Sequence, residues 1–142
     1  MRIATILCAV LLTVCGCARE GGEPATPGPF DGEQALAYVR EQLAFGPRVP
    51  GTPAHVAAGD WIVRAMRERA DTVVEQVWEH RTADGRTLAM RNIFARFRPD
   101  VAERVLYVTH WDTRPRSESE RDSAQRTMAV PGANDGASGT AM

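Results

Sequence analysis

The chain has 142 residues, and 44% of them are hydrophobic, so it is long enough to bury the core of one globular unit. Its 17 basic residues are all arginine, and with 18 acidic residues they give a formal net charge of −1. This balance predicts no binding to nucleic acid, because nucleic-acid-binding domains carry an excess of positive charge.

The first 16 residues have the pattern of a bacterial lipoprotein signal peptide. The basic start Met1-Arg2 precedes the apolar run 3–14, which is too short to span a bilayer as a mature helix. Gly16-Cys17 then follows where such proteins are cleaved and lipidated, and an ordinary cleaved signal peptide is the alternative. We expect a lipid anchor on Cys17 and a location in the bacterial cell envelope, facing the periplasm or the exterior. Cleavage leaves Cys17 as the last cysteine, which excludes an intramolecular disulfide and a cysteine metal site.

Residues 17–30 predict a flexible tether, and residues 31–142 predict the folded part of the chain. The tether is rich in Gly, Pro and Glu and has no apolar periodicity. Asp31 and Gln34 then have the spacing of a helix capping box, and apolar residues follow at helical spacing. Gly46-Pro47 predicts that this first helix ends near residue 44.

A second helix and a β-hairpin are predicted next. Thr52 has the character of an N-cap, and Pro53 suits the first helical position. Residues 72–79 and 87–97 are rich in β-branched and aromatic side chains, and the turn signal Asp84-Gly85 separates them. This order predicts two strands joined as a hairpin.

Residues 105–108 predict a central strand. They are four consecutive apolar residues between polar ones, which is typical of a strand buried on both faces. Together with the helices, the hairpin and a new helix start near Gly139, this strand indicates an α/β sandwich. Functional sites in such folds form beyond the carboxyl ends of the strands, where His110 stands.

His110 and Asp112 form the first half of a candidate zinc site. In an extended segment, residues two apart point to the same side. The carboxylate of Asp112 can therefore hold one ring nitrogen of His110 and direct the other towards a cation. The alternative is an ordinary hydrogen-bonded histidine at a strand end.

Asp135 forms the second half of the candidate site. It lies in Gly-Ala-Asn-Asp-Gly-Ala-Ser-Gly, residues 132–139, whose small side chains allow the backbone to pack closely around a ligand. A plain Asn-Asp-Gly turn is the alternative. Ser138 as a hydrolase nucleophile is disfavoured, because Thr140 stands where the nucleophile elbow requires glycine.

Taken together, these segments resemble zinc metallopeptidase family 28, which includes aminopeptidases and glutaminyl cyclases. The matching pieces occur in the family order and cover nearly all of the chain from Asp31 onward: Phe45-Gly-Pro-Arg-Val-Pro-Gly-Thr-Pro-Ala-His55, Asn92-Ile93, His110-Trp-Asp-Thr-Arg-Pro115 and Gly132-Ala-Asn-Asp-Gly-Ala-Ser-Gly139. The piece that begins at His110 is most similar to the bacterial glutaminyl-cyclase-like lipoprotein branch. The resemblance implies an α/β fold, a three-layer sandwich with a mixed central sheet and a zinc site at the carboxyl ends of its strands.

The resemblance also implies roles for single residues. Asp135 matches the carboxylate that binds zinc in the family. In the dinuclear peptidases, that carboxylate bridges two zinc ions. His110 matches a zinc ligand in those peptidases, whereas this position need not bind metal in single-zinc cyclases. Asp112 matches the residue beside the site that orients the histidine. His55 and His80 have no role in the family, and we predict that both lie on the surface.

The implied function is that of a zinc-dependent enzyme acting on peptide N-termini. The resemblance favours glutaminyl-peptide cyclotransferase, which forms pyroglutamate; the alternatives are a zinc aminopeptidase and a non-catalytic binding lipoprotein on the same scaffold. The family's catalytic domain is much longer than this chain, so we expect the general-base glutamate and the remaining ligands beyond Met142. No catalytic residue is therefore assigned, and we expect these residues to be an inactive N-terminal part, incomplete at the zinc site. The expected partners are peptide or protein N-termini and the membrane, the latter through the lipid anchor alone.

Overall fold

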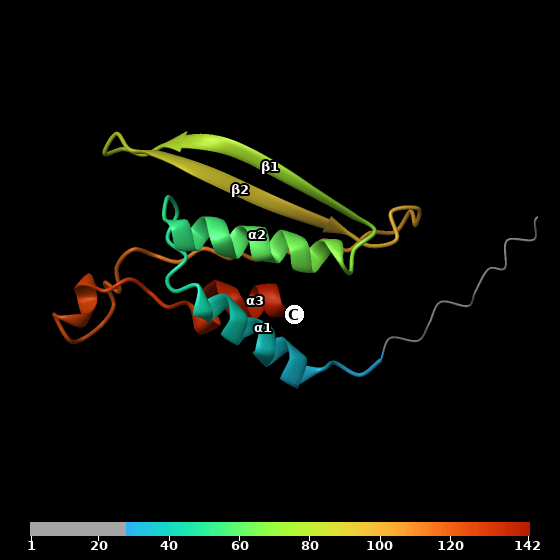
Figure 1. Ribbon diagram of the computed structural model, residues 1–142, viewed down its shortest axis with the longest axis horizontal. Helices are drawn as coiled ribbons and strands as arrows, with labels where there is room; N and C mark the ends of the chain where they lie inside the picture. The colour runs from blue at the N-terminus through green and yellow to red at the C-terminus, as the bar shows by residue number, and fades with distance from the viewer. Residues whose placement is uncertain (1–27) are drawn as a thin grey trace, which may run out of the picture. The chain divides into compact units, whose positions relative to one another are not determined.

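A computed structural model describes residues 28–142, and the predicted signal peptide and Cys17 lie outside this range. The described elements, shown in Figure 1, are α1 (Gly32–Ala44), α2 (Pro53–Arg67), β1 (Thr72–Arg81), β2 (Thr87–Arg96), the short turns η1 (Gln125–Thr127) and η2 (Ala133–Ala137), and α3 (Ser138–Ala141). Within residues 28–142, no helix is long and apolar enough to cross a membrane.

Both long helices begin at the predicted cap residues. The carboxylate of Asp31 accepts a hydrogen bond from the backbone N–H of Gln34 at 3.0 Å. The hydroxyl of Thr52 accepts one from the N–H of His55 at 3.3 Å, and Pro53 occupies the first turn of α2. Each such cap contributes about 1 kcal/mol, because it satisfies a backbone donor that has no partner inside the helix.

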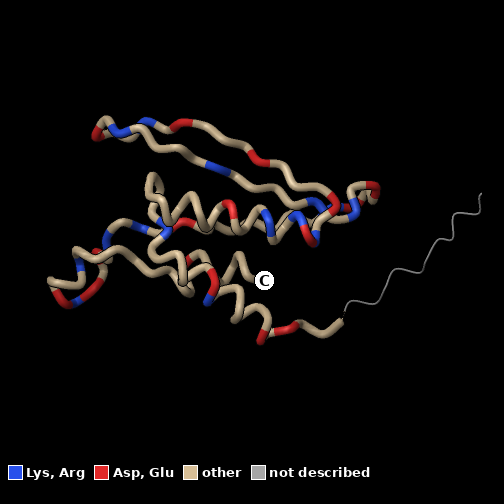
Figure 2. Tube along the Cα trace, in the orientation of Figure 1, with Lys and Arg blue, Asp and Glu red and all other residues tan. Residues whose placement is uncertain are grey.

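Strands β1 and β2 form the predicted hairpin, and α2 lies along it. The register pairs Thr72 with Arg96 and Arg81 with Thr87. Contacts join α2 to both strands, and Figure 2 colours the positions of the basic and acidic residues along the Cα trace of the helix and the hairpin. Arg91 of β2 pairs with Asp60 of α2 at 2.8 Å. An exposed pair of this kind contributes on the order of 0.2–1 kcal/mol, so it fixes orientation more than stability.

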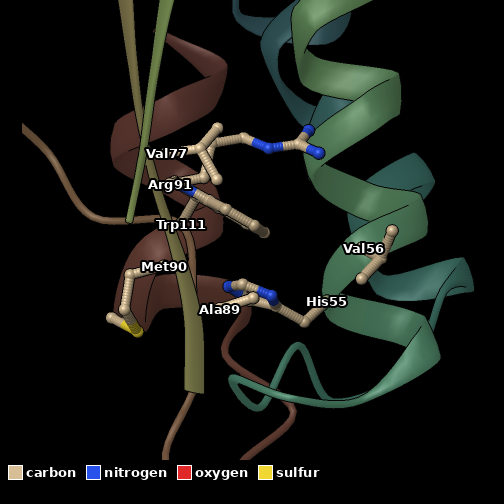
Figure 3. Close-up of a pocket in the computed structure, with 7 residues that line it drawn as sticks. All are labelled: His55, Val56, Val77, Ala89, Met90, Arg91 and Trp111. Carbon is tan, nitrogen blue, oxygen red and sulfur yellow. The ribbon is translucent and has the colours of Figure 1, made fainter. Parts of the chain in front are cut away.

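Trp111 anchors the segment that carries His110 and Asp112. Its ring stacks on the imidazole of His55, with ring centroids 4.2 Å apart and an angle of 15° between the planes. A small cavity of about 60 Å³ beside the two rings is shown in Figure 3; it is lined by His55, Val56, Val77, Ala89, Met90, Arg91 and Trp111. The contact fixes the backbone on either side of Trp111, where the two candidate site residues lie.

The stacked rings overturn one prediction. His55 was predicted to lie on the surface, but its residue is 5% exposed. The reason is a contact with Trp111, which is distant in the sequence and covers the imidazole. His80, in contrast, is exposed on β1, as predicted.

Residues 105–108 do not form the predicted buried strand within the part of the chain that the structure describes. Val105 and Leu106 are 97% and 81% exposed, and within residues 28–142 the segment pairs with no strand. A central strand needs neighbours that satisfy its backbone groups on both edges, and β1 and β2 pair only with each other here. The α/β class is therefore confirmed, whereas the three-layer sandwich stays a prediction.

Gly59→Ala tests how closely Trp111 must approach α2. A Cβ atom at residue 59 would lie 2.8 Å from Cη2 of Trp111 and 3.1 Å from Nη1 of Arg91. We expect the variant to lose about 1–3 kcal/mol of unfolding free energy by overpacking, although alanine is by itself the better helix former by about 1 kcal/mol. Urea denaturation of the parent and the variant measures the difference.

The control is the same change in a Trp111→Leu background, where the clashing ring atoms are gone. There Gly59→Ala should cost clearly less, and the difference between the two backgrounds is the coupling between residues 59 and 111. An equal loss in both backgrounds would show that the ring of Trp111 does not require glycine at residue 59.

Candidate metal centre

The structure brings His110 and Asp135 together from positions 25 residues apart. Nε2 of His110 lies 2.9 Å from Oδ1 of Asp135. The other ring nitrogen, Nδ1, lies 3.1 Å from the main-chain oxygen of Asp112 and 3.4 Å from its carboxylate. The side chains of His110 and Asp135 are 53% and 50% exposed, so a solute can reach the pair. All three predicted site residues therefore meet at one place.

The imidazole of His110 lies between two hydrogen-bond acceptors. The main-chain oxygen of Asp112 can only accept, so Nδ1 must donate to it, and a neutral ring then carries a lone pair on Nε2. That lone pair faces a carboxylate oxygen of Asp135 at 2.9 Å, where two acceptors repel each other. A positive charge at Nε2 removes the conflict, whether it is a proton or a metal ion. The geometry therefore fits either a protonated histidine paired with Asp135 or a metal ion bound between the two groups.

Gly136 allows Asp135 to approach the histidine. Its φ of 97° lies in the left-handed region, which side chains other than glycine rarely adopt. A Cβ atom at this position would lie 3.2 Å from Cε1 and Nδ1 of His110 and 3.1 Å from the main-chain oxygen of Asp112. The glycine-rich turn η2 thus packs closely against the histidine.

Two buried polar side chains that the sequence did not single out hold these loops. Arg48 and Gln42 are the largest fully buried side chains among the described residues. Arg48 donates to the main-chain oxygens of both site-bearing segments, and Nε2 of Gln42 donates to the main-chain oxygen of Ala137 at 3.1 Å. The motif 45–55 contains Arg48, and that is the one signal that pointed to this residue.

The donor set fits two of the ligands that zinc prefers. Zinc binds histidine nitrogen and carboxylate oxygen at about 2.0–2.2 Å, so two such atoms on a tetrahedral ion lie about 3.3 Å apart. The 2.9 Å between His110 and Asp135 would need to open by a few tenths of an ångström. A catalytic zinc takes three protein ligands, and within residues 28–142 no group of three His, Cys, Asp or Glu residues is placed to hold a metal. With a zinc ion between them, His110 and Asp135 would account for two of these three ligand positions.

Comparison with known proteins places the chain in a family. No family model and no curated protein matches it. Solved structures do match it, and three of them each cover 79% of this chain with a TM-score of 0.75. A glutaminyl cyclase from Porphyromonas gingivalis is 43% identical, with 39% of its own length covered, and a Zn-dependent exopeptidase from Parabacteroides distasonis is 40% identical, with 38% of its length covered. A leucine aminopeptidase precursor from Bacteroides thetaiotaomicron is 38% identical, with 39% of its length covered. The chain spans about two fifths of their length. It belongs to the family of these bacterial glutaminyl cyclases and zinc-dependent exopeptidases, which confirms the predicted resemblance to zinc metallopeptidase family 28.

His55 predicts a pH dependence of stability. Burial lowers the pKa of His55; the carboxylate of Asp112 raises it and the guanidinium of Arg91 lowers it further, and the net direction is down. The unfolded chain, with a histidine pKa of about 6.5, therefore binds the proton more readily than the folded chain. The stabilisation is complete above about pH 6.5 and is lost as the pH falls towards the lower pKa of the folded state.

His55→Phe keeps an aromatic ring against Trp111 but cannot titrate. The free energy of unfolding, measured in urea between about pH 5 and pH 8, should fall less steeply with acidification in this variant than in the parent. His80→Phe, at an exposed position, is the control, and its free energy of unfolding should change with pH as steeply as that of the parent. If His55→Phe also keeps that slope, the buried imidazole is not its source.

Proposed function

We propose that this chain is part of a zinc-dependent enzyme that acts on peptide N-termini. We propose that this enzyme is a glutaminyl-peptide cyclotransferase, which converts an N-terminal glutamine to pyroglutamate. The observation that carries the proposal is the pair His110–Asp135, whose ring nitrogen and carboxylate oxygen converge at 2.9 Å in a solvent-accessible place. The identity of 43% to a glutaminyl cyclase supports the choice of reaction. Because the chain spans 39% of that protein, the activity is proposed for the whole enzyme.

Each residue of the pair has a role in this proposal. Zinc, when bound, supplies a Lewis acid for the carbonyl under attack. Asp135 holds the ion through its carboxylate, and His110 either is a second ligand or orients Asp135 by a hydrogen bond. Asp112 fixes the ring of His110 through its main-chain oxygen, so that Nε2 faces Asp135. The carboxylate that moves the proton is assigned to a part of the family's domain that this chain does not span.

A zinc aminopeptidase is the second candidate. The leucine aminopeptidase precursor and the exopeptidase, at 38% and 40% identity, favour it. The two reactions differ in their products, because a cyclase converts an N-terminal glutamine to pyroglutamate and ammonia, whereas an aminopeptidase releases the first amino acid. Incubation of the full-length protein with a glutaminyl peptide and with aminoacyl amides, followed by mass spectrometry, separates them. Zinc binding without either product would favour the non-catalytic binding lipoprotein.

The proposal extends to the complete fold. Residues 105–108 are apolar, and Val105, Leu106, Tyr107 and Val108 are all more than half exposed. Such a row is typical of a strand that another part of a larger domain covers. We include a three-layer sandwich with a mixed central sheet in the proposal, with residues 105–108 as one of its strands.

Asp135→Asn should remove zinc and activity together. Asparagine has nearly the same shape but lacks the charge that balances the ion, so we expect the purified full-length variant to contain less than about one tenth of the parent's zinc. Metal analysis by mass spectrometry measures this content. Asp84→Asn, an exposed carboxylate in the hairpin turn, is the matched control and should retain zinc. Unchanged zinc content in Asp135→Asn would remove the basis of the assignment.

Asp112→Asn should have a milder effect than Asp135→Asn. The main-chain oxygen of Asp112 lies closer to Nδ1 of His110 than its carboxylate does, 3.1 Å against 3.4 Å, and the substitution keeps the closer contact. We expect zinc affinity or activity to fall by about 10–100-fold at most. Titration with a competing chelator measures the affinity. A complete loss of zinc would mean that Asp112 binds the ion directly.

The proposed location is the bacterial cell envelope, with Cys17 as the lipid attachment point. The apolar run 3–14 followed by Gly16-Cys17 supports this. Cys17→Ser should release or misprocess the protein, because a lipid chain holds such a protein in the bilayer. Fractionation of cells that express the parent and the variant measures it. A variant that matures and sediments with membranes like the parent would contradict the lipoprotein assignment.

A further inference from the structure

Arg48 lies at the centre of a set of main-chain oxygens that converge from three segments. Its Nε donates to the oxygen of Trp111 at 2.9 Å, and Nη2 donates to the oxygen of Gly132 at 2.8 Å. Nη1 donates to the oxygens of Pro131 at 3.2 Å and Gln42 at 3.4 Å. The side chain is fully buried, with 0% exposure. We call this guanidinium and its four oxygens the Arg48 clamp.

The Arg48 clamp satisfies a buried charge with carbonyls instead of a carboxylate. An isolated cation in the protein interior is costly unless every donor finds an acceptor. Burial lowers the pKa of Arg48, and the carboxylate of Asp112 raises it. The planar fork of five N–H groups can reach four separate oxygens, whereas a lysine ammonium is a single point with three donors. The arrangement depends on arginine, because without it the four oxygens lose the guanidinium N–H groups on which they converge.

The oxygens that the clamp holds belong to the two halves of the candidate metal centre. Trp111 lies directly between His110 and Asp112 in the chain. Gly132 begins the turn that carries Asp135, and its oxygen also accepts from the N–H of Ala137 at 3.2 Å, which closes that turn. The main-chain oxygen of Arg48 itself accepts from the N–H of Thr113 at 3.1 Å. One residue thus bridges the backbones on both sides of the His110–Asp135 contact.

We propose that Arg48 is a positioning residue for the metal centre: by bridging the two loops it sets the separation of Nε2 of His110 from the carboxylate of Asp135. The part that concerns zinc rests on the proposed function. The part that concerns the histidine and the carboxylate stands on the geometry of the chain itself.

The test compares Arg48→Lys and Arg48→Met with Ile62→Ala in the full-length protein. Ile62 is a buried residue of α2 that makes no part of the clamp, so its truncation lowers stability without touching the two loops. Histidine-selective ¹⁵N labelling then reports the ring nitrogens of His110 in metal-free protein, with the exposed His80 as internal reference. A second measurement is the zinc affinity of each variant against a competing chelator.

The expected result separates positioning from general stability. Both Arg48 variants should shift the ¹⁵N signals of His110 towards those of a free imidazole and weaken zinc binding by about 10–100-fold, whereas Ile62→Ala should change neither. Signals of His110 in folded Arg48→Lys and Arg48→Met that match the parent, or an equal shift in Ile62→Ala, would overturn the proposal. A parent that binds no zinc would refute the proposed function, and the histidine signals would still decide the role of Arg48.

If neither Arg48 variant folds, the parent protein provides the test. The side-chain N–H protons of Arg48 should be resolved and protected from exchange with solvent, and substitution of Asp135 by Asn should leave that protection in place because the clamp uses only main-chain oxygens. Rapid exchange of these protons in the folded parent would overturn the proposal.

Discussion

The candidate metal centre depends on how four main-chain oxygens are satisfied where three segments meet. These segments are the end of α1, the backbone around Trp111 and the glycine-rich loop before η2, and Arg48 donates hydrogen bonds to oxygens of all three. Buried carbonyls without donors are costly, so such loops can meet only around a donor group. Arg48 provides it, and the backbones that carry His110 and Asp135 are held on either side of one planar group. The chemistry of the site follows from this constraint, because two half-exposed side chains have no packing of their own to fix their separation.

Trp111 fixes the same segment from the opposite direction. Its ring lies on His55 and against Gly59 of α2, so the residue between His110 and Asp112 is held by a side chain as well as by its carbonyl. The two neighbours of Trp111 contact each other, with Nδ1 of His110 at 3.1 Å from the main-chain oxygen of Asp112. His110, held at Nδ1 by the main chain of Asp112, presents Nε2 to Asp135. In the sequence His110-Trp-Asp112, the contacts of Trp111 therefore fix the positions of the two polar residues on either side of it.

Local signals in the sequence predicted the local structure well. The caps at Asp31 and Thr52 and the turn at Asp84-Gly85 act over a few residues, so their outcome does not depend on the rest of the chain. Burial was predicted less well, because it depends on distant partners. His55 is covered by Trp111, while residues 105–108, apolar as they are, have no covering element among residues 28–142.

The sequence predicted the residues of the candidate site but not the residue that holds its two loops together. His110 and Asp112 at a strand end and Asp135 in a glycine-rich turn are predicted from the residue pattern, and the resemblance between motifs implies their roles. The structure places the three residues in contact. The role of Arg48 was not predicted, because two of its acceptors are the main-chain oxygens of Trp111 and Gly132, 63 and 84 residues further along the chain. A main-chain oxygen leaves no pattern in the amino-acid sequence. A buried arginine in a rigid loop with two prolines is the kind of residue for which such a role can be suspected.

Crystallography of the full-length protein with zinc, with data collected at the zinc absorption edge, tests the central claim most directly. The account predicts an anomalous peak about 2.0–2.2 Å from a carboxylate oxygen of Asp135, with the guanidinium of Arg48 still bound to the oxygens of Trp111 and Gly132. A second peak at the same distance from Nε2 of His110 would indicate the dinuclear arrangement expected of an aminopeptidase. Zinc bound away from Asp135, or no zinc in an active enzyme, would contradict the account.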